Sequence, residues 1–327
     1  MNIYDIAKQS GYSIATVSRV LNGSSAVSAK AREKILEVIK ENDYVPNAFA
    51  RGLGLNTMRM IGLLCTNISD PFYAKAVSLV ESHLRQREFD PLLCCTGNRL
   101  EDKKKYLDLL LQKHVDAVIL IGSGFRENTD NSHIENAAKQ VPVVIINGLV
   151  ELPNTYCVLC NEKEAVRENV LRLCNDGFSD ILYLYDALTY SGCMKLEGYR
   201  SGMIDSGTPL REDLIVRTEK NLRTIQHTVL NLLDSGVSFS AVIASEDLLA
   251  VGALKALSSR SISIPVIGFN NSILAECSTP TLTSVDNMLS SLCPTAVNLV
   301  IDLLEGREAP QKVMISSKLV VRETYKI

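Results

Sequence analysis

The chain has 327 residues, of which 46% are hydrophobic and 22% charged, and its net charge at neutral pH is −3. Such a length suits two or three domains with large cores, and the composition excludes a disordered chain. No apolar run approaches the roughly 18 residues of a membrane span, and Met1 leads directly into a helical pattern without a signal peptide. We therefore expect a cytoplasmic protein that does not bind a membrane.

The first two predicted elements are short helices separated by Gly11. Apolar residues recur at helical spacing in residues 3–10 and again in residues 13–21, so the second helix can pack against the first. The other face of the second helix carries small, hydroxyl-bearing or basic residues, namely Ile14, Ala15, Thr16, Ser18, Arg19 and Asn22. Such side chains suit base edges and phosphates in a DNA major groove, so this pattern predicts a helix-turn-helix.

A third helix is predicted from a Ser28 cap to about Asn42, followed by a short helical segment over 47–55. Two turns of helix are marginal in water, and Gly52 and Gly54 weaken this segment further. Residues 1–60 contain eight Lys and Arg against five Asp and Glu, a net charge of +3, which leaves −6 for the rest of the chain. A basic module on an acidic body fits a protein that reads DNA.

From Met60 onward, short apolar strands alternate with amphipathic helices. The predicted strands are 60–65, 91–95, 117–121, 141–146, 156–159, 181–185, 241–244, 266–269, 313–315 and 318–321. Continuous apolar strands separated by helices indicate parallel sheets covered on both faces. We expect an α/β core of two Rossmann-like lobes, with more than one crossing between them and a ligand cleft where the strands end.

No catalytic constellation is evident in the sequence. None of the four histidines falls in a metal or nucleophile motif, and Gly122-Ser123-Gly124 lacks the third glycine of a dinucleotide loop. Cys157 and Cys160 are spaced as CxxC, but on a strand they point to opposite faces and no second pair completes a zinc site. We therefore predict no enzyme activity, no catalytic residue, no cofactor and no metal.

Several motifs of the first 60 residues together resemble the lac repressor/GalR family of bacterial transcriptional regulators. They are IATVSRVLNG at 14–23, VS at 27–28, YVPNA at 44–48 and ARGL at 50–53. The resemblance implies a helix-turn-helix domain at 1–45, a hinge helix at 46–58 and a periplasmic-binding-protein-like core at 59–327. The core would have one lobe at about 59–159 and 287–327 and the other at about 160–286. It also implies a homodimer, usually a repressor, that binds a palindromic operator under control of a small-molecule effector.

Roles at the expected DNA interface follow from side-chain chemistry. Arg19 is the candidate for a bidentate contact to guanine, while Ile14 and Ala15 offer apolar contacts to thymine methyl groups. Candidates for phosphate or sugar contacts are Thr16, Ser18, Asn22, Ser28, Tyr44 and Asn47. Tyr4 either belongs to the protein core or contacts the DNA backbone. The resemblance adds Ile3, Ser13 and Ala50 to the interface, and it inserts Leu53 into the minor groove.

The expected effector pocket departs from the family pattern. Phe72 and Tyr73 can flank a ring, and Ser123 lies at a strand end. Four further wall residues, Cys160, Lys195, Glu246 and Asn270, stand where the family usually has aspartate, arginine, asparagine and aspartate.

Fewer carboxylates for sugar hydroxyls, together with a lysine point charge, favour a sugar derivative with a carboxylate or phosphate. Glu246 counts against that reading. The alternative is a diverged pocket with an unrelated ligand or with none. A second alternative for the whole chain is a solute-binding receptor without a regulatory role, which would need a signal peptide and no DNA module.

Overall fold

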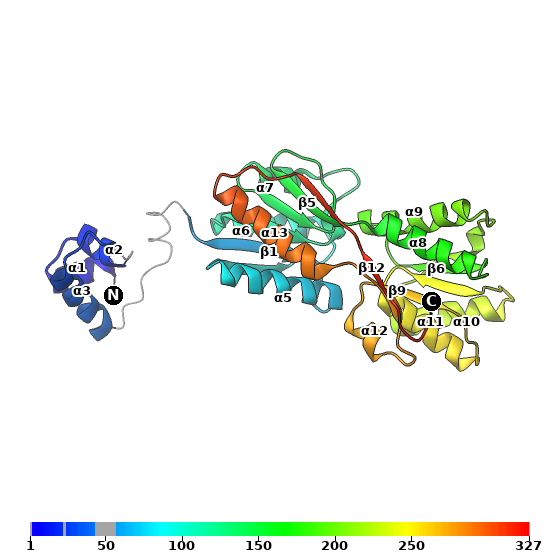
Figure 1. Ribbon diagram of the computed structural model, residues 1–327. Helices are drawn as coiled ribbons and strands as arrows, with labels where there is room; N and C mark the ends of the chain where they lie inside the picture. Colours follow the sequence, from blue (N-terminus) through cyan, green and yellow to red (C-terminus); the bar gives the residue numbers. More distant parts are fainter. Residues whose placement is uncertain (1, 22–23, 43–56, 327) are drawn as a thin grey trace. The chain divides into compact units, whose positions relative to one another are not determined.

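The computed structural model describes residues 2–21, 24–42 and 57–326 in two compact units (Figure 1). One unit comprises residues 1–60 with 114–116, and the other comprises the remainder. Five of the predicted DNA contacts and most of the predicted hinge lie outside the described residues. These contacts are Asn22, Tyr44, Asn47, Ala50 and Leu53.

Three short helices lie in the described part of the N-terminal unit, namely α1 (Ile3–Ser10), α2 (Ile14–Leu21) and α3 (Ala29–Glu41). Asn2 and Asp5 form a reciprocal capping box at the start of α1, and Gly11 ends this helix with φ of 74°. The side chain of Ser28 accepts a hydrogen bond from the Ala31 amide at the start of α3. The predicted breaks between the helices are therefore formed by local caps.

The core of this unit is small and is shared by all three helices. Ile6 and Ala7 of α1, Val17 and Val20 of α2, and Ile35 and Val38 of α3 form one buried cluster. Only a rigid cluster of this kind fixes the angle at which α2 is presented. Later in the sequence of this unit, the Asp116 carboxylate accepts hydrogen bonds from the Met58 and Met60 amides and from the Thr57 hydroxyl, each at 3.0 Å.

The larger unit is built on two six-stranded sheets. The first, ordered β11–β5–β4–β3–β1–β2, consists of β1 (Met60–Cys65), β2 (Asp90–Cys95), β3 (Ala117–Ile121), β4 (Val143–Ile146), β5 (Thr155–Cys160) and β11 (Lys312–Ile315). The second, ordered β12–β10–β9–β8–β6–β7, consists of β6 (Ile181–Tyr185), β7 (Ile215–Arg217), β8 (Ala241–Ala244), β9 (Val266–Phe269), β10 (Thr283–Asp286) and β12 (Lys318–Val320). The recorded strand pairs are parallel except β10 with β12. The predicted α/β class with two parallel-sheet lobes is confirmed.

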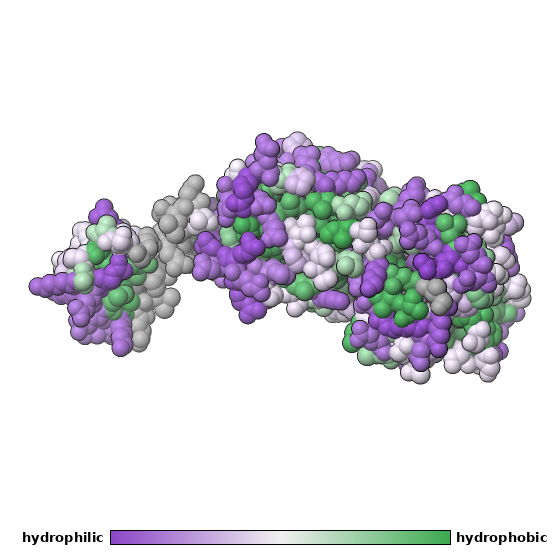
Figure 2. All heavy atoms as spheres, viewed as in Figure 1, coloured by the Kyte–Doolittle hydropathy of each residue, from purple (hydrophilic) through white to green (hydrophobic). Residues whose placement is uncertain are grey.

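Helices cover both sheets (Figure 1). The first lobe has α5 (Pro71–Gln86), α6 (Leu100–Gln112), η1 (Ser123–Phe125), α7 (Ser132–Ala138) and α13 (Leu289–Leu304). The second has α8 (Glu162–Asn175), α9 (Tyr190–Asp205), η2 (Glu212–Leu214), α10 (Leu222–Asp234), α11 (Asp247–Ser259) and α12 (Ile273–Cys277). None of the described helices is long and apolar enough to cross a membrane. Figure 2 shows a viewed surface that is mostly hydrophilic, with apolar residues gathered in a few patches.

The chain crosses between the lobes three times, after β5, after β10 and between β11 and β12. The expectation that residues 287–327 all belong to the first lobe is wrong for the final segment. β12 pairs antiparallel with β10, and Tyr325 is buried in the core of the second lobe. The Arg322 guanidinium reinforces this position, because it donates hydrogen bonds to the Leu282 carbonyl and to Asn271 Oδ1.

Two strands of the second lobe, β7 and β10, are absent from the predicted elements. β10 reads Thr-Ser-Val-Asp, which lacks the apolar run of a buried parallel strand. Thr283 and Ser284 are nevertheless fully buried, because their hydroxyls donate to the Tyr325 carbonyl and to Asp247 Oδ1. Burial of hydroxyls is tolerated when each has a partner, and that pairing is not visible in the sequence.

Candidate DNA interface and inter-lobe cavity

The face of α2 opposite the small core is open to solvent. Ile14, Ala15 and Arg19 are exposed, whereas Val17 and Val20 are buried. The Arg19 guanidinium has no carboxylate partner among the described residues, so its donors remain available. Ile14 is 41% exposed, so its apolar side chain is accessible to a ligand.

The hydroxyls predicted to touch DNA have structural partners as well. Ser13 Oγ accepts from the Thr16 amide at 3.2 Å and lies 2.9 Å from Thr16 Oγ1, so it caps α2. Ser28 is exposed and caps α3, and Ser18 is half-buried. Capping holds these helix starts in place and leaves oxygen lone pairs free for further contacts.

Tyr4 and Ile3 differ in exposure at the start of α1. Tyr4 is 67% exposed, which rules out the core alternative for this residue. Ile3 is half-buried and packs against the small core, so only part of its side chain is accessible to DNA.

The two lobes of the larger unit enclose a cavity of about 710 Å³. Its wall includes Thr66 and Gly122, which follow strands β1 and β3, and Asp186 and Ser245, which follow strands β6 and β8. A smaller pocket of about 170 Å³ shares Asp70, Phe72, Lys220, Glu246 and Asn270 with it. Strand carboxyl ends of both sheets therefore face one space, as expected for a ligand site in this architecture.

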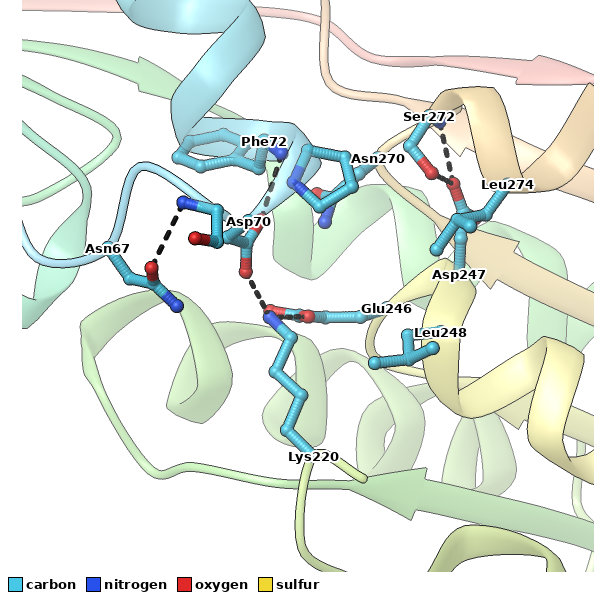
Figure 3. A pocket seen from close by; sticks show the side chains of 12 residues that line it. Asn67, Asp70, Phe72, Lys220, Glu246, Asp247, Leu248, Asn270, Ser272 and Leu274 are labelled. Atoms are coloured by element: carbon cyan, nitrogen blue, oxygen red, sulfur yellow. Dashed lines mark hydrogen bonds and ion pairs between the residues drawn. The ribbon is translucent and has the colours of Figure 1, made fainter. Parts of the chain in front are cut away.

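Lys220 bridges the two lobes at this cavity. Its Nζ lies 2.6 Å from Asp70 Oδ2 of the first lobe and forms an ion pair with Glu246 of the second (Figure 3). The three side chains are 31%, 10% and 23% exposed. Burial alone would lower the pKa of Lys220, but the charges of Glu246 and Asp70 outweigh it and raise the pKa above its usual value. Glu246 is thus not a free carboxylate.

Lys195 contributes little free charge to the cavity, although it is part of the wall. The side chain is buried, its Nζ donates to the Ser245 carbonyl at 3.0 Å, and Nζ lies 4.1 Å from the centre of the Phe269 ring. Glu162 Oε1 lies 3.5 Å from the same nitrogen and also accepts from Asn147 and Ser191. The predicted role of Lys195 as a point charge for the effector is therefore weakened by an internal partner.

Cys160 does not line the cavity, which corrects the prediction for this residue. The thiol lies in the buried cluster between the first sheet and helices α5 and α13, and burial raises its pKa well above the usual value. Asn270 does line the cavity, where it adopts φ of 98° and its Oδ1 accepts from Asn287 Nδ2. A positive φ is tolerated better by asparagine than by most residues.

Phe72 and Tyr73 form an edge-to-face pair on the wall, with ring centres 5.2 Å apart. Burial raises the pKa of Tyr73 to about 12, so its hydroxyl stays protonated. Ser123 Oγ of the first lobe donates to Thr189 Oγ1 of the second at 2.9 Å. Phe72, Tyr73 and Ser123 therefore combine two aromatic faces with hydroxyl groups, a lining suited to a carbohydrate.

Replacing Gly122 by alanine should disturb this wall. A Cβ at Gly122 would lie 2.6 Å from Tyr73 Cε1, and the residue has φ of +95°. We expect a loss of about 1–3 kcal/mol in the free energy of unfolding, measured by urea denaturation. Gly97→Ala is the control, because it has φ of +65° but no neighbour within 4 Å. Equal losses in both variants would assign the effect to the backbone alone.

Six charged wall residues were missed by the sequence reasoning, namely Lys103, Arg126, Glu127, Asp186, Arg217 and Lys220. Arg217 ends β7 and Lys220 follows it, so the failure to predict β7 hid both. Within the described ranges no group of three or more His, Cys, Asp or Glu side chains is placed to hold a metal ion.

Comparison with known proteins agrees with both units. Residues 2–47 match the bacterial regulatory proteins of the lacI family, and residues 58–320 match the periplasmic binding proteins and sugar binding domain of the LacI family. An HTH-type transcriptional regulator of Lachnoclostridium phytofermentans is 44% identical over 99% of both chains. The ribose operon repressor of Halalkalibacterium halodurans is 31% identical over 99% of this chain and 97% of its own.

Among solved structures, the lac repressor dimer bound to operator and an anti-inducer superposes with a TM-score of 0.88. Its sequence identity is 22%, it covers 99% of this chain and 98% of its own, and at that identity the likeness concerns the fold. The matches of both regions and the full-length relatives agree with the exposed α2 face and the cavity between the lobes. The chain belongs to the lacI family of bacterial regulatory proteins and is a DNA-binding transcriptional regulator.

Proposed function

We propose that this regulator is a repressor that binds a palindromic operator as a homodimer and is controlled by a carbohydrate-type effector in the inter-lobe cavity. The observation that carries the proposal is the face of α2 on which Ile14, Ala15 and Arg19 are exposed, while the opposite face of the helix packs in the buried core. A two-fold dimer places two such faces on two half-sites, which is how a small module gains affinity.

Relatives support the repressor and effector parts of this proposal. The relative from Halalkalibacterium halodurans is named as a repressor of the ribose operon, and the matched core family is described by sugar binding. The lac repressor structure contains a dimer on its operator. Apolar patches on the larger unit (Figure 2) are consistent with self-association.

Control would follow from linkage between the two ligands. Effector binding favours one arrangement of the lobes, and the dimer transmits that preference to the two hinge segments at 46–58. The hydrogen bonds of Asp116 to residues 57–60 fix the chain at the C-terminal end of this segment. Effector and operator must then change each other's affinity by the same factor. In this reading the protein acts in the cytoplasm and has no enzymatic activity.

Footprinting with the full-length protein tests the proposal. We expect protection of a palindrome near the operon of the protein itself, and light scattering should give the mass of a dimer. Addition of the correct effector should weaken or strengthen that protection. A chain that protects no palindrome under any condition, yet binds a sugar, would instead be a solute receptor.

A further inference from the structure

Some charged side chains on the cavity wall have an ion-pair partner within the protein, and others have none among the described residues. Lys220 pairs with Asp70 and Glu246, and Lys103 Nζ lies 2.6 Å from Glu127 Oε1. Two lysines therefore hold these three carboxylates in ion pairs, which leaves one negative charge in excess beside Lys220. A neutral or cationic ligand would have to displace a lysine before it could reach them, at the cost of a partly buried ion pair.

Two arginines on the same wall have no carboxylate partner among the described residues. Arg126, from the first lobe, donates through Nη1 to the Leu149 carbonyl at 3.3 Å, and its guanidinium lies 5.9 Å from the centre of the Tyr190 ring. Arg217, from the second lobe, donates through Nε to the Asp186 carbonyl at 3.0 Å. These contacts orient both side chains and leave terminal N–H groups unused.

One carboxylate on the wall, that of Asp186, opposes them, since no ion pair to a described residue neutralises it. Asp186 and Arg217 lie on the same side of the cavity, where the backbone contact joins them. The two guanidinium groups exceed this carboxylate by one positive charge, which offsets the excess negative charge beside Lys220, so the preference for an anion rests on the unused N–H donors of the arginines and not on net charge. Lys195 does not alter this balance, because Glu162 is its internal partner.

We propose that the effector is a carbohydrate that carries an anionic group, and that Arg126 and Arg217 receive this group from opposite lobes. The inference rests on the proposed function and specifies the ligand class of its site. A guanidinium presents a planar fork of donors that matches a carboxylate or a phosphate, and such charged hydrogen bonds are the strong ones. Phe72 and Tyr73 then face the sugar ring, and hydroxyls such as Thr189 bind its oxygens.

An anion held by both lobes also selects one arrangement of them. Arg126 follows η1 of the first lobe and Arg217 ends β7 of the second, so only the arrangement that brings both to the anion gains the full interaction. A neutral sugar lacks this differential contact. The anionic group therefore supplies the free energy that shifts the lobes, while contacts to the ring and hydroxyls determine which sugar is bound.

The test uses the full-length protein and titration calorimetry with matched sugars. Glucose and galactose are the neutral probes, gluconate and galacturonate the acids, glucose 6-phosphate the phosphate, and inorganic phosphate reports anion binding without a sugar. We expect at least one acid or sugar phosphate to bind about tenfold or more tightly than its neutral parent. That affinity should fall as salt is raised, whereas neutral sugars should be insensitive to salt.

Arg126→Gln and Arg217→Gln should each weaken binding of the anionic sugar by about tenfold. Arg200→Gln is the matched control, because Arg200 pairs with Glu212 and does not line the cavity. Binding of neutral sugars alone, failure of every anionic probe, or undiminished binding by both variants would each overturn the inference. Operator protection measured on the same preparations separates these results from a failure of the proposed function.

Discussion

Replacing Arg19 by alanine is expected to weaken operator binding at physiological salt by about 30-fold or more while leaving the N-terminal unit folded. The side chain is exposed on α2 and has no carboxylate partner among the described residues. One bidentate contact to guanine is worth about 1–3 kcal/mol of discrimination, and a dimer loses two of them. The operator affinity should therefore fall by about 2–6 kcal/mol, or roughly 30-fold to more than 10⁴-fold. Fluorescence anisotropy with a labelled operator measures this loss.

The matched control for Arg19 is Lys34→Ala, which removes one exposed positive charge from α3 of the same unit. A loss of general electrostatic attraction should weaken operator and unrelated DNA equally. Arg19→Ala should instead reduce the ratio between the two affinities. Circular dichroism must show unchanged helix content, since Arg19 takes no part in the buried cluster. An Arg19→Ala protein that still prefers its operator would refute the assignment.

The DNA-reading unit was predictable from sequence because its determinants are local. Gly11 ends one helix, Ser28 starts another, and buried Val17 and Val20 alternate with exposed Arg19 at helical spacing. Each of these signals acts within about four residues of its effect. The two-lobed core was predictable for a similar reason, because continuous apolar strands identify parallel sheets.

The effector cavity was only partly predictable because its geometry depends on distant residues. Lys220 reaches Asp70 across 150 positions of sequence, and no local pattern indicates that pair. Cys160 falls at the expected strand end, but the side chain turns into the core of the first lobe. The strand β10 was missed since its buried hydroxyls depend on partners such as Asp247 and Tyr325. A sequence places such residues in an element, whereas the packing of several elements decides where each side chain points.

Replacing Lys220 by methionine is expected to destabilise the larger unit. Methionine preserves the length of the side chain but leaves Asp70 and Glu246, on opposite lobes, without their shared cation (Figure 3). Loss of one partner from a well-buried ion pair costs about 3–5 kcal/mol. The groups here retain some exposure to water, so we expect a loss of about 1–3 kcal/mol in the free energy of unfolding. Urea denaturation at neutral pH measures it.

The loss of unfolding free energy caused by Lys220→Met should become smaller as the pH is lowered. Burial raises the pKa of Glu246, Asp186 adds to that effect, and Lys220 and Lys195 oppose it. Without Lys220 the folded-state pKa should rise further above the unfolded value. A carboxyl group with a raised folded pKa binds more protons when folded, so its contribution to stability falls as pH rises. The penalty of Lys220→Met should therefore be full at pH 7 and shrink as pH falls through the folded pKa of Glu246.

Two further variants show whether the ion pair itself causes the penalty of Lys220→Met. Lys220→Arg keeps the positive charge and should retain most of the stability, whereas a packing defect would appear in both substitutions. Adding Asp70→Asn to Lys220→Met removes one of the stranded carboxylates, so the double variant should be more stable than the two single losses added together predict. Strict additivity would show that Asp70 and Lys220 are not coupled. Coupling would mean that the lobes are held by a charge pair lying inside the effector site, where any ligand that enters must compete with it.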